Sequence, residues 1–223
     1  MIKTVLFDLD GTLVDTEPAA ALAIRETFES WGIQVKLEDA RFITGRTWEV
    51  AFEYLFQKYS IPVGREAASA AMIDKYREAL CTHLKLVPGG ADAVRALSQK
   101  YPLALVSGSH RKEIFFALDQ LKVREHFKVV LGAEDYENSK PSPEGYLKAV
   151  QMLGADPSHT LVFEDSEAGI SSARAANLWV VAIESTNHFG QDTSHAHEKI
   201  KDLTEINVAW IEAFRSRQPA SSF

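Results

Sequence analysis

The stretch FDLDGTLVDTEP, Phe7 to Pro18, places two aspartates directly after a short apolar run. The run Thr4–Phe7 is continuously apolar over too few residues for a helix, which is typical of a strand buried in a parallel sheet. Asp8 and Asp10 follow it, two residues apart. A buried strand that ends in paired negative charge indicates either a turn that exposes the carboxylates or a cation that compensates for them.

The composition narrows the classes of protein that are possible. The chain has 223 residues, a formal net charge of −7 and a single cysteine, Cys81. The acidic balance argues against nucleic-acid or anionic-membrane partners, and one thiol cannot form an intrachain disulfide. We find no signal-peptide pattern and no apolar run near the ~20 residues of a membrane span. We therefore expect a cytoplasmic protein, in which an anionic substrate would need a local source of positive charge.

Further short apolar runs alternate with helical patterns after residue 86. This alternation predicts an α/β fold with a doubly wound, Rossmann-like parallel sheet. The predicted strands, with the first included, are Thr4–Phe7, Leu103–Val106, Lys128–Leu131, Thr160–Phe163 and Trp179–Ile183.

The region between the first strand and residue 86 has a different pattern. Apolar residues recur there at helical spacing, over Ala19–Trp31, Thr47–Tyr59 and Arg65–Leu86. We therefore predict a core domain formed by residues 1–15 and 87–223, with a helical domain, residues 16–86, inserted after the first strand.

Polar residues follow the predicted strands where each one ends. Ser107-Gly108-Ser109 follows the second strand, Lys140 lies in the loop after the third, and Glu164-Asp165 follows the fourth. Because ligand sites in open parallel sheets form at the carboxyl ends of the strands, we expect these groups to converge on Asp8. Clustered carboxylates repel one another unless a cation lies among them, and oxygen ligands near phosphate favour Mg²⁺.

The same residues suggest a chemistry. A carboxylate such as Asp8 can act as a nucleophile toward a phosphoryl group. A second acid two residues on, Asp10, can protonate the leaving oxygen and then activate water. Ser107 and Lys140 can hold phosphate oxygens.

Four motifs resemble the haloacid dehalogenase superfamily: D-L-D-G-T from Asp8, S-G-S from Ser107, K-P-S-P from Lys140 and E-D-S from Glu164. They occur in the family's order, and the resemblance covers the whole chain. It extends to the helical-cap branch that includes phosphoglycolate phosphatases, sugar-phosphate phosphatases and β-phosphoglucomutases. The resemblance implies a Mg²⁺-dependent phosphatase that acts on a small phosphorylated metabolite through an aspartyl-phosphate.

The resemblance also implies roles for individual residues. Asp8 is expected as nucleophile and metal ligand, and Asp10 as general acid/base that gives its backbone carbonyl to the metal. Asp165 is the further metal ligand, and Glu164 binds the metal directly or through water. The substrate-binding residues expected on this basis are Thr12, Gly108, Ser109, His110 and, in the turn that resembles the cap's specificity loop, Gly45 and Arg46.

Departures from the family pattern bear on the branch. Dehalogenases lack the second aspartate, so Asp10 favours phosphoryl chemistry. The mutases, and several sugar phosphatases, have a histidine at the position of Ala20, and its absence here weakens the alternative of a sugar phosphomutase. A phosphoacceptor signalling domain is a further alternative, but it would need neither the acid at Asp10 nor the helical insertion. A catalytically silent binding module is another, and it is disfavoured because every role in the site is filled. The substrate is not readable from the sequence; we expect a monomer and leave an oligomer open.

Overall fold

The computed structural model describes residues 1–36, 38–39, 48–188 and 190–214. The chain divides into two compact units. The first, the core unit, contains Met1–Asp15 and Leu86–Phe223, and the second, the helical unit, contains Thr16–Lys85.

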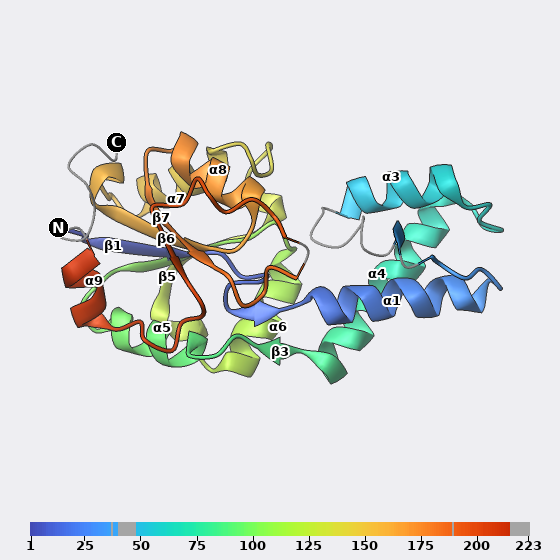
Figure 1. The fold of residues 1–223 in the computed structure, drawn as a ribbon, viewed down its shortest axis with the longest axis horizontal. Helices are drawn as coiled ribbons and strands as arrows, with labels where there is room; N and C mark the ends of the chain where they lie inside the picture. Colours follow the sequence, from blue (N-terminus) through green and yellow to red (C-terminus); the bar gives the residue numbers. More distant parts are fainter. Residues whose placement is uncertain (37, 40–47, 189, 215–223) are drawn as a thin grey trace. The chain divides into compact units, whose positions relative to one another are not determined.

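The core unit is organised around a parallel sheet (Figure 1). Its strand order is β5-β4-β1-β6-β7-β8, so β1 lies between β4 and β6. Val5 pairs with Leu103 of β4 on one side and Leu161 of β6 on the other. The strands are β1 (Thr4–Phe7), β4 (Leu103–Val106), β5 (Phe127–Leu131), β6 (Thr160–Glu164), β7 (Trp179–Ile183) and β8 (Glu198–Ile200).

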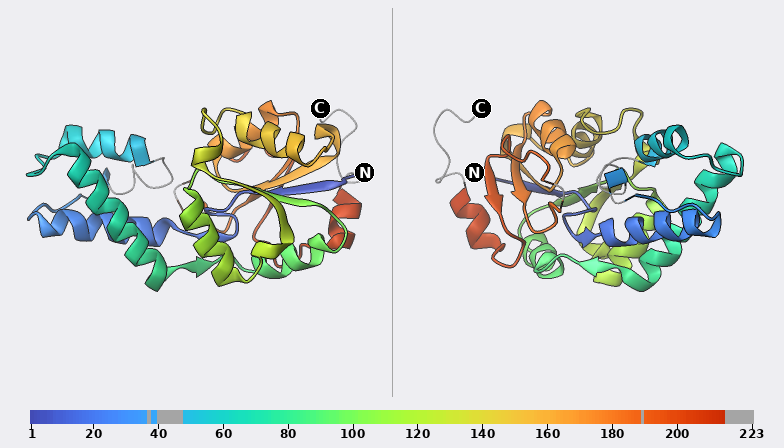
Figure 2. Two further views of the ribbon diagram at one scale, coloured as in Figure 1. Left: turned by 180° about the vertical axis from the view of Figure 1, so that it is seen from behind. Right: turned by 45° about the vertical axis from the view of Figure 1, so that its right-hand side comes forward.

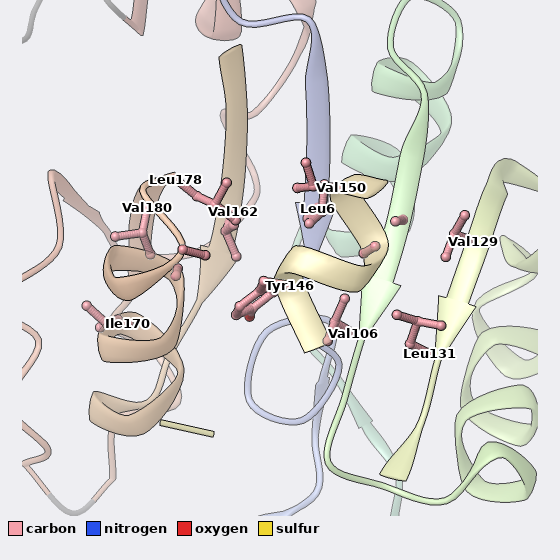
Figure 3. Close-up of a cluster of buried hydrophobic side chains, with 14 of the residues drawn as sticks. Leu6, Val106, Val129, Leu131, Tyr146, Val150, Val162, Ile170, Leu178 and Val180 are labelled. Carbon is pink, nitrogen blue, oxygen red and sulfur yellow. The ribbon is translucent and has the colours of Figure 1, made fainter. Parts of the chain in front are cut away.

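Helices cover both faces of this sheet (Figures 1 and 2). Side chains alternate between the faces along each strand, and Leu6, Val106 and Val162 belong to the cluster beneath α7 and α8 (Figure 3). On the other face, Trp210 and Phe214 of α9 pack against Phe163 and Trp179. The core helices are α5 (Gly90–Ser98), α6 (Arg111–Leu121), α7 (Glu144–Met152), α8 (Glu167–Ala175) and α9 (Val208–Phe214), with short 3₁₀ turns η1 (Arg124–His126), η2 (Ala133–Asp135) and η3 (Pro157–His159).

The prediction of a doubly wound α/β sheet is confirmed, and all five predicted strands are present within one residue at each end. The sixth strand, β8, was missed. Its sequence, Glu-Lys-Ile, is short and polar and gives no apolar run. Such a sequence suits an edge strand, and β8 pairs with β7 alone.

The helical unit has its own apolar core. Ile24 and Phe28 of α1 pack with Leu55 of α3 and Met72 of α4. Trp48 lies against the rings of Phe52 and Tyr76. The helices are α1 (Glu17–Ser30), α3 (Trp48–Lys58) and α4 (Arg65–His83).

The last predicted helix of this region, Arg65–Leu86, is too long. The backbone becomes extended at Leu84, with φ −62° and ψ 118°, and α4 therefore ends at His83. After Leu84 the chain forms β3 (Lys85–Leu86), which pairs with β2 (Val14–Asp15) in a two-stranded sheet. Sequence periodicity did not distinguish this short ladder from a final helical turn.

Within the described part of the chain, no helix has both the length and the apolar character needed to cross a membrane.

Candidate active site

The carboxyl ends of the central strands bring the sequence-predicted acids together. Asp8 follows β1, Glu164 is the last residue of β6, and Asp165 comes next. The Asp8 backbone N–H donates to the carbonyl of Phe163 over 3.0 Å, which continues the ladder past the strand end. One carboxylate oxygen from each of the three acids lies within 4.8 Å of the others, and all three side chains are buried.

Lys140 is the cation of this cluster. Its Nζ donates to Asp8 Oδ1 over 2.5 Å and to Glu164 Oε1 over 2.6 Å. A third contact runs to the carbonyl of Val106 at 3.3 Å. Burial lowers the pKa of Lys140, but the two carboxylates outweigh it and hold the pKa well above the usual value. The ammonium therefore stays charged and joins the ends of β1 and β6.

One ammonium does not compensate for three buried carboxylates. Burial raises the pKa of Asp8 to about 8; Lys140 opposes this shift, whereas Glu164 and Asp10 add to it. Burial, together with the charges of Glu164 and Asp8, also raises the pKa of Asp165 well above its usual value. With every group ionised, the cluster carries two uncompensated negative charges, which is the deficit that one divalent cation removes.

Glu164 differs from the other two acids because hydrogen bonds occupy both of its oxygens. Oε1 accepts from Lys140 and from the Tyr146 hydroxyl. Oε2 accepts from the backbone N–H groups of Asp165 and Ser166, at 2.8 and 2.9 Å, and from the Ser166 hydroxyl. Its side chain has no exposed surface. This arrangement suits a residue that positions Lys140 and the loop at Asp165.

The turn after β1 brings Gly11 and Thr12 against Asp165. Gly11 has φ +83°, and a Cβ built there would lie 2.0 Å from Asp165 Oδ2. Thr12 has no exposed surface, and its hydroxyl donates to Asp165 Oδ1 over 3.4 Å. Thr12, which was expected from the sequence to bind substrate, therefore contacts Asp165 through its hydroxyl and has no surface of its own exposed.

Asp10 lies against the loop after β4. Its Oδ2 accepts hydrogen bonds from the hydroxyls of Ser107, over 2.9 Å, and Ser109, over 2.8 Å. The backbone N–H of Ser109 in turn donates to Ser107 Oγ. The Tyr136 hydroxyl donates to the Ser107 carbonyl over 2.7 Å and thereby holds this loop in place. Asp10, the predicted general acid/base, is thus a hydrogen-bond neighbour of Ser107 and Ser109, which are predicted to bind the phosphate and the substrate.

The remaining predicted residues are less closely integrated. Gly108 is exposed, with open space where a side chain would be. His110 is exposed and its Nδ1 lies 3.1 Å from Glu134 Oε1. Gly45 and Arg46, the predicted residues of the cap loop, lie outside the described residues.

Sequence reasoning missed two tyrosines at the site, Tyr136 and Tyr146. Neither belongs to the four motifs, and the hydroxyl of each donates to a motif residue, Tyr136 to the Ser107 carbonyl and Tyr146 to Glu164. For Tyr146 the available signal was its place on the apolar face of a predicted helix, since a buried tyrosine usually needs a partner for its hydroxyl.

Comparisons with known proteins agree with this geometry. The family model of haloacid dehalogenase-like hydrolases matches residues 5–183. The validoxylamine A 7'-phosphate phosphatase of Streptomyces hygroscopicus subsp. limoneus is 33% identical over 212 residues, which cover 92% of this chain and 96% of that protein. The fructose-1-phosphate phosphatase YqaB of Escherichia coli (strain K12) is 29% identical over 180 residues, which cover 80% and 95%.

A solved structure shows the same fold. The β-phosphoglucomutase of Clostridium difficile superposes with a TM-score of 0.78 at 21% identity and covers 97% of this chain and all of that one. The chain belongs to the haloacid dehalogenase-like hydrolase family.

Proposed function

We propose that this phosphoric monoester hydrolase is a Mg²⁺-dependent phosphatase of small phosphomonoesters, of the phosphoglycolate or sugar-phosphate type. The observation that carries the proposal is the buried cluster of Asp8, Glu164 and Asp165 around Lys140. Asp10 lies two residues from Asp8 and is held by two hydroxyls. Relatives named as phosphatases of sugar-like phosphates support the substrate class.

The donor set fits Mg²⁺. Asp8 and Asp165, with the backbone carbonyl of Asp10, are the ligands we propose, and Glu164 acts on them through hydrogen bonds. Carboxylate and carbonyl oxygens are the ligands that this ion prefers. When bound, Mg²⁺ supplies positive charge that keeps Asp8 ionised and screens it from an anionic phosphate. Burial raises the pKa of Asp8 even with Lys140 in contact, which supports a further cation at this site.

In the first step we propose, an Asp8 carboxylate oxygen bonds to phosphorus and the ester P–O bond breaks. Asp10, protonated, gives its proton to the leaving oxygen, and the alcohol departs. Lys140, which contacts Asp8 at 2.5 Å, stabilises the negative charge of the transferring group. The hydroxyls of Ser107 and Ser109 would have to turn from Asp10 to donate to that group.

In the second step Asp10, now ionised, takes a proton from a water molecule. The water oxygen attacks phosphorus, the bond to Asp8 breaks, and inorganic phosphate leaves. The sum of the two steps is ester plus water giving alcohol plus phosphate, with Asp8 and Asp10 restored.

We further propose that the helical region 16–86 is a cap that selects the substrate, with Gly45 and Arg46 on its specificity loop. An arginine there suits an anionic or polyhydroxyl leaving group. At the core, Gly108, Ser109 and His110 are the corresponding candidates. His110 would have to exchange its contact with Glu134 for the substrate.

The test is phosphate release from a panel of small phosphomonoesters, with Mg²⁺ and with EDTA, by the wild type and by Asp8→Asn. We expect release that needs Mg²⁺ and is lost in the variant, and the preferred ester will identify the substrate branch. Absence of release from every ester would overturn the phosphatase proposal.

The sugar phosphomutase alternative is tested in the same samples. A mutase would convert a sugar 1-phosphate into its isomer with little release of phosphate. We expect the opposite balance, because Ala20 stands where the mutases have a histidine and offers no group that can exchange a proton.

A further inference from the structure

Tyr146 lies on α7, inside the apolar cluster that packs beneath the sheet (Figure 3). Its side chain has no exposed surface. Its hydroxyl nevertheless reaches the candidate active site, where it donates to Glu164 Oε1 over 3.2 Å. Burying a phenol hydroxyl is costly unless it finds a partner, so this contact fixes how the ring can lie.

The ring of Tyr146 also meets Lys140. The ammonium lies over the ring, 5.0 Å from its centre, and its three donors point to Asp8, Glu164 and the Val106 carbonyl. The negative face of an aromatic ring attracts a cation, most strongly where water is excluded. Tyr146 therefore touches Lys140 through the ring and touches the anionic partner of Lys140 through the hydroxyl.

We propose that Tyr146 is a positioning residue for phosphoryl transfer, which holds the Lys140 ammonium against Asp8 by contacting both Lys140 and Glu164. The proposal rests on the proposed phosphatase function. A lysine side chain has a flexible four-carbon stem, and its charge is well placed only if its surroundings fix it. A displacement of about 1 Å at a reacting group can cost ~10²-fold in rate.

The alternative is that Tyr146 only fills the core, and conservative variants separate the two roles. Tyr146→Phe keeps the ring and removes one oxygen. Tyr146→Leu removes the ring as well. Tyr101→Phe is the matched control, because Tyr101 is also buried but lies just before β4, at the opposite end of the strands from the site.

The experiment measures kcat/KM on the best ester, the Kd of inorganic phosphate by calorimetry with Mg²⁺ present, and Tm. For Tyr146→Phe we expect kcat/KM to fall ~10-fold and phosphate binding to weaken by about fivefold, with Tm close to wild type. Tyr146→Leu should lose more of both. Tyr101→Phe should change neither. In a Glu164→Gln background the Phe substitution should add little, because the two residues act as a unit.

Wild-type kcat/KM and phosphate affinity in Tyr146→Phe would overturn the proposal. So would losses matched by Tyr101→Phe, losses that are additive with Glu164→Gln, or a wild type that binds no phosphate. If the wild type binds phosphate but hydrolyses no ester, the phosphatase proposal fails, and the phosphate Kd of Tyr146→Phe decides the positioning role separately.

Discussion

Each unit of the molecule buries a carboxylate, and the two environments are opposite. In the core unit, Asp8 shares one ammonium, that of Lys140, with Glu164 and lies beside Asp165. In the helical unit, Asp39 is also buried, but it accepts hydrogen bonds from the Tyr54 and Tyr59 hydroxyls and from the Lys58 ammonium.

The pKa values of the two aspartates diverge accordingly. Burial raises the pKa of Asp8 to about 8. Burial also acts to raise the pKa of Asp39, but hydrogen bonds from Lys58, Tyr59 and Tyr54 outweigh it and lower the pKa to about 2. Donors contribute to this difference, because Asp39 accepts from three groups whereas Asp8 shares one ammonium with Glu164. A carboxylate with matched donors stabilises the fold, whereas a cluster with too few donors is arranged for a cation and a substrate.

The largest effect that we expect is the loss of catalysis in Asp8→Asn, which removes the Asp8 carboxylate from the core cluster. The amide cannot act as the nucleophile, so phosphate release should fall by about 10⁴-fold or more. Release is measured at saturating Mg²⁺, with folding followed by circular dichroism. Asp92→Asn, which changes an exposed carboxylate, is the control and should keep wild-type activity. Appreciable release by Asp8→Asn would mean that another group attacks phosphorus.

Two glycines, Gly11 in the core unit and Gly32 in the helical unit, separate the effect of a close contact with Asp165 from the effect of backbone strain. Both Gly11 and Gly32 have positive φ, at +83° and +73°. A Cβ at Gly11 meets Asp165, whereas a Cβ at Gly32 meets nothing within 4 Å. Gly11→Ala should therefore lower kcat/KM by ~10²-fold through displacement of Asp165.

Gly32→Ala carries only the backbone strain, which costs about 1 kcal/mol, and should leave kcat/KM within a few fold of wild type. Thermal melts recorded beside the kinetics separate strain from site damage. Equal losses of activity in the two variants would show that positive φ, rather than the contact with Asp165, is the cause.

Asp165→Asn removes one carboxylate from the core cluster. It should bring the cluster closer to the situation of Asp39, in which the donors match the charge of the carboxylate. Removing one uncompensated carboxylate should raise the Tm of the metal-free protein by about 2–4 °C, as expected for ~1 kcal/mol in a chain of this size. Mg²⁺ at ~100 times its Kd should stabilise the wild type by about 2.7 kcal/mol and the variant far less. Calorimetric melts with EDTA and with Mg²⁺ measure both effects, and an equal Mg²⁺ shift in the two proteins would exclude Asp165 as a ligand.

The smallest effect is the acid dependence of Asp39. Its pKa is lower in the folded protein than its ordinary value of 3.8, so its contribution to stability is present above pH 4 and is lost as the pH falls toward 2. Asp39→Asn should lower Tm by a few degrees at pH 7, and the difference from wild type should shrink between pH 4 and 2. A difference that stays constant over this range would mean that the Asp39 charge contributes nothing.

Sequence reasoning recovered the sheet and the convergence of its strand ends for a specific reason. Parallel strands buried on both faces are short apolar runs, and the polar residues that follow them have few structural reasons to be there. Asp8, Lys140 and Asp165 were therefore visible, and their convergence at one edge of the sheet followed from the topology.

The finer arrangement could not be predicted because it depends on side-chain direction. Nothing in E-D-S distinguishes Glu164, whose oxygens are occupied by hydrogen bonds, from Asp165, whose Oδ1 accepts from Thr12. The partners of Asp39 lie 15 to 20 residues away, on α3 and directly after its end, and the periodicity of that helix shows only its apolar face.

The central place of β1 has a consequence for synthesis on the ribosome. The strand emerges first, yet its partners on either side, Leu103 and Leu161, are made much later. At roughly 5–20 residues per second, the apolar run Thr4–Phe7 must wait several seconds with both edges unpaired. Lys3 and Asp8 flank that run, and charges in such positions discourage nascent strands from pairing with one another. We therefore expect Asp8, beyond the catalytic role proposed for it, to disfavour aggregation of the newborn chain.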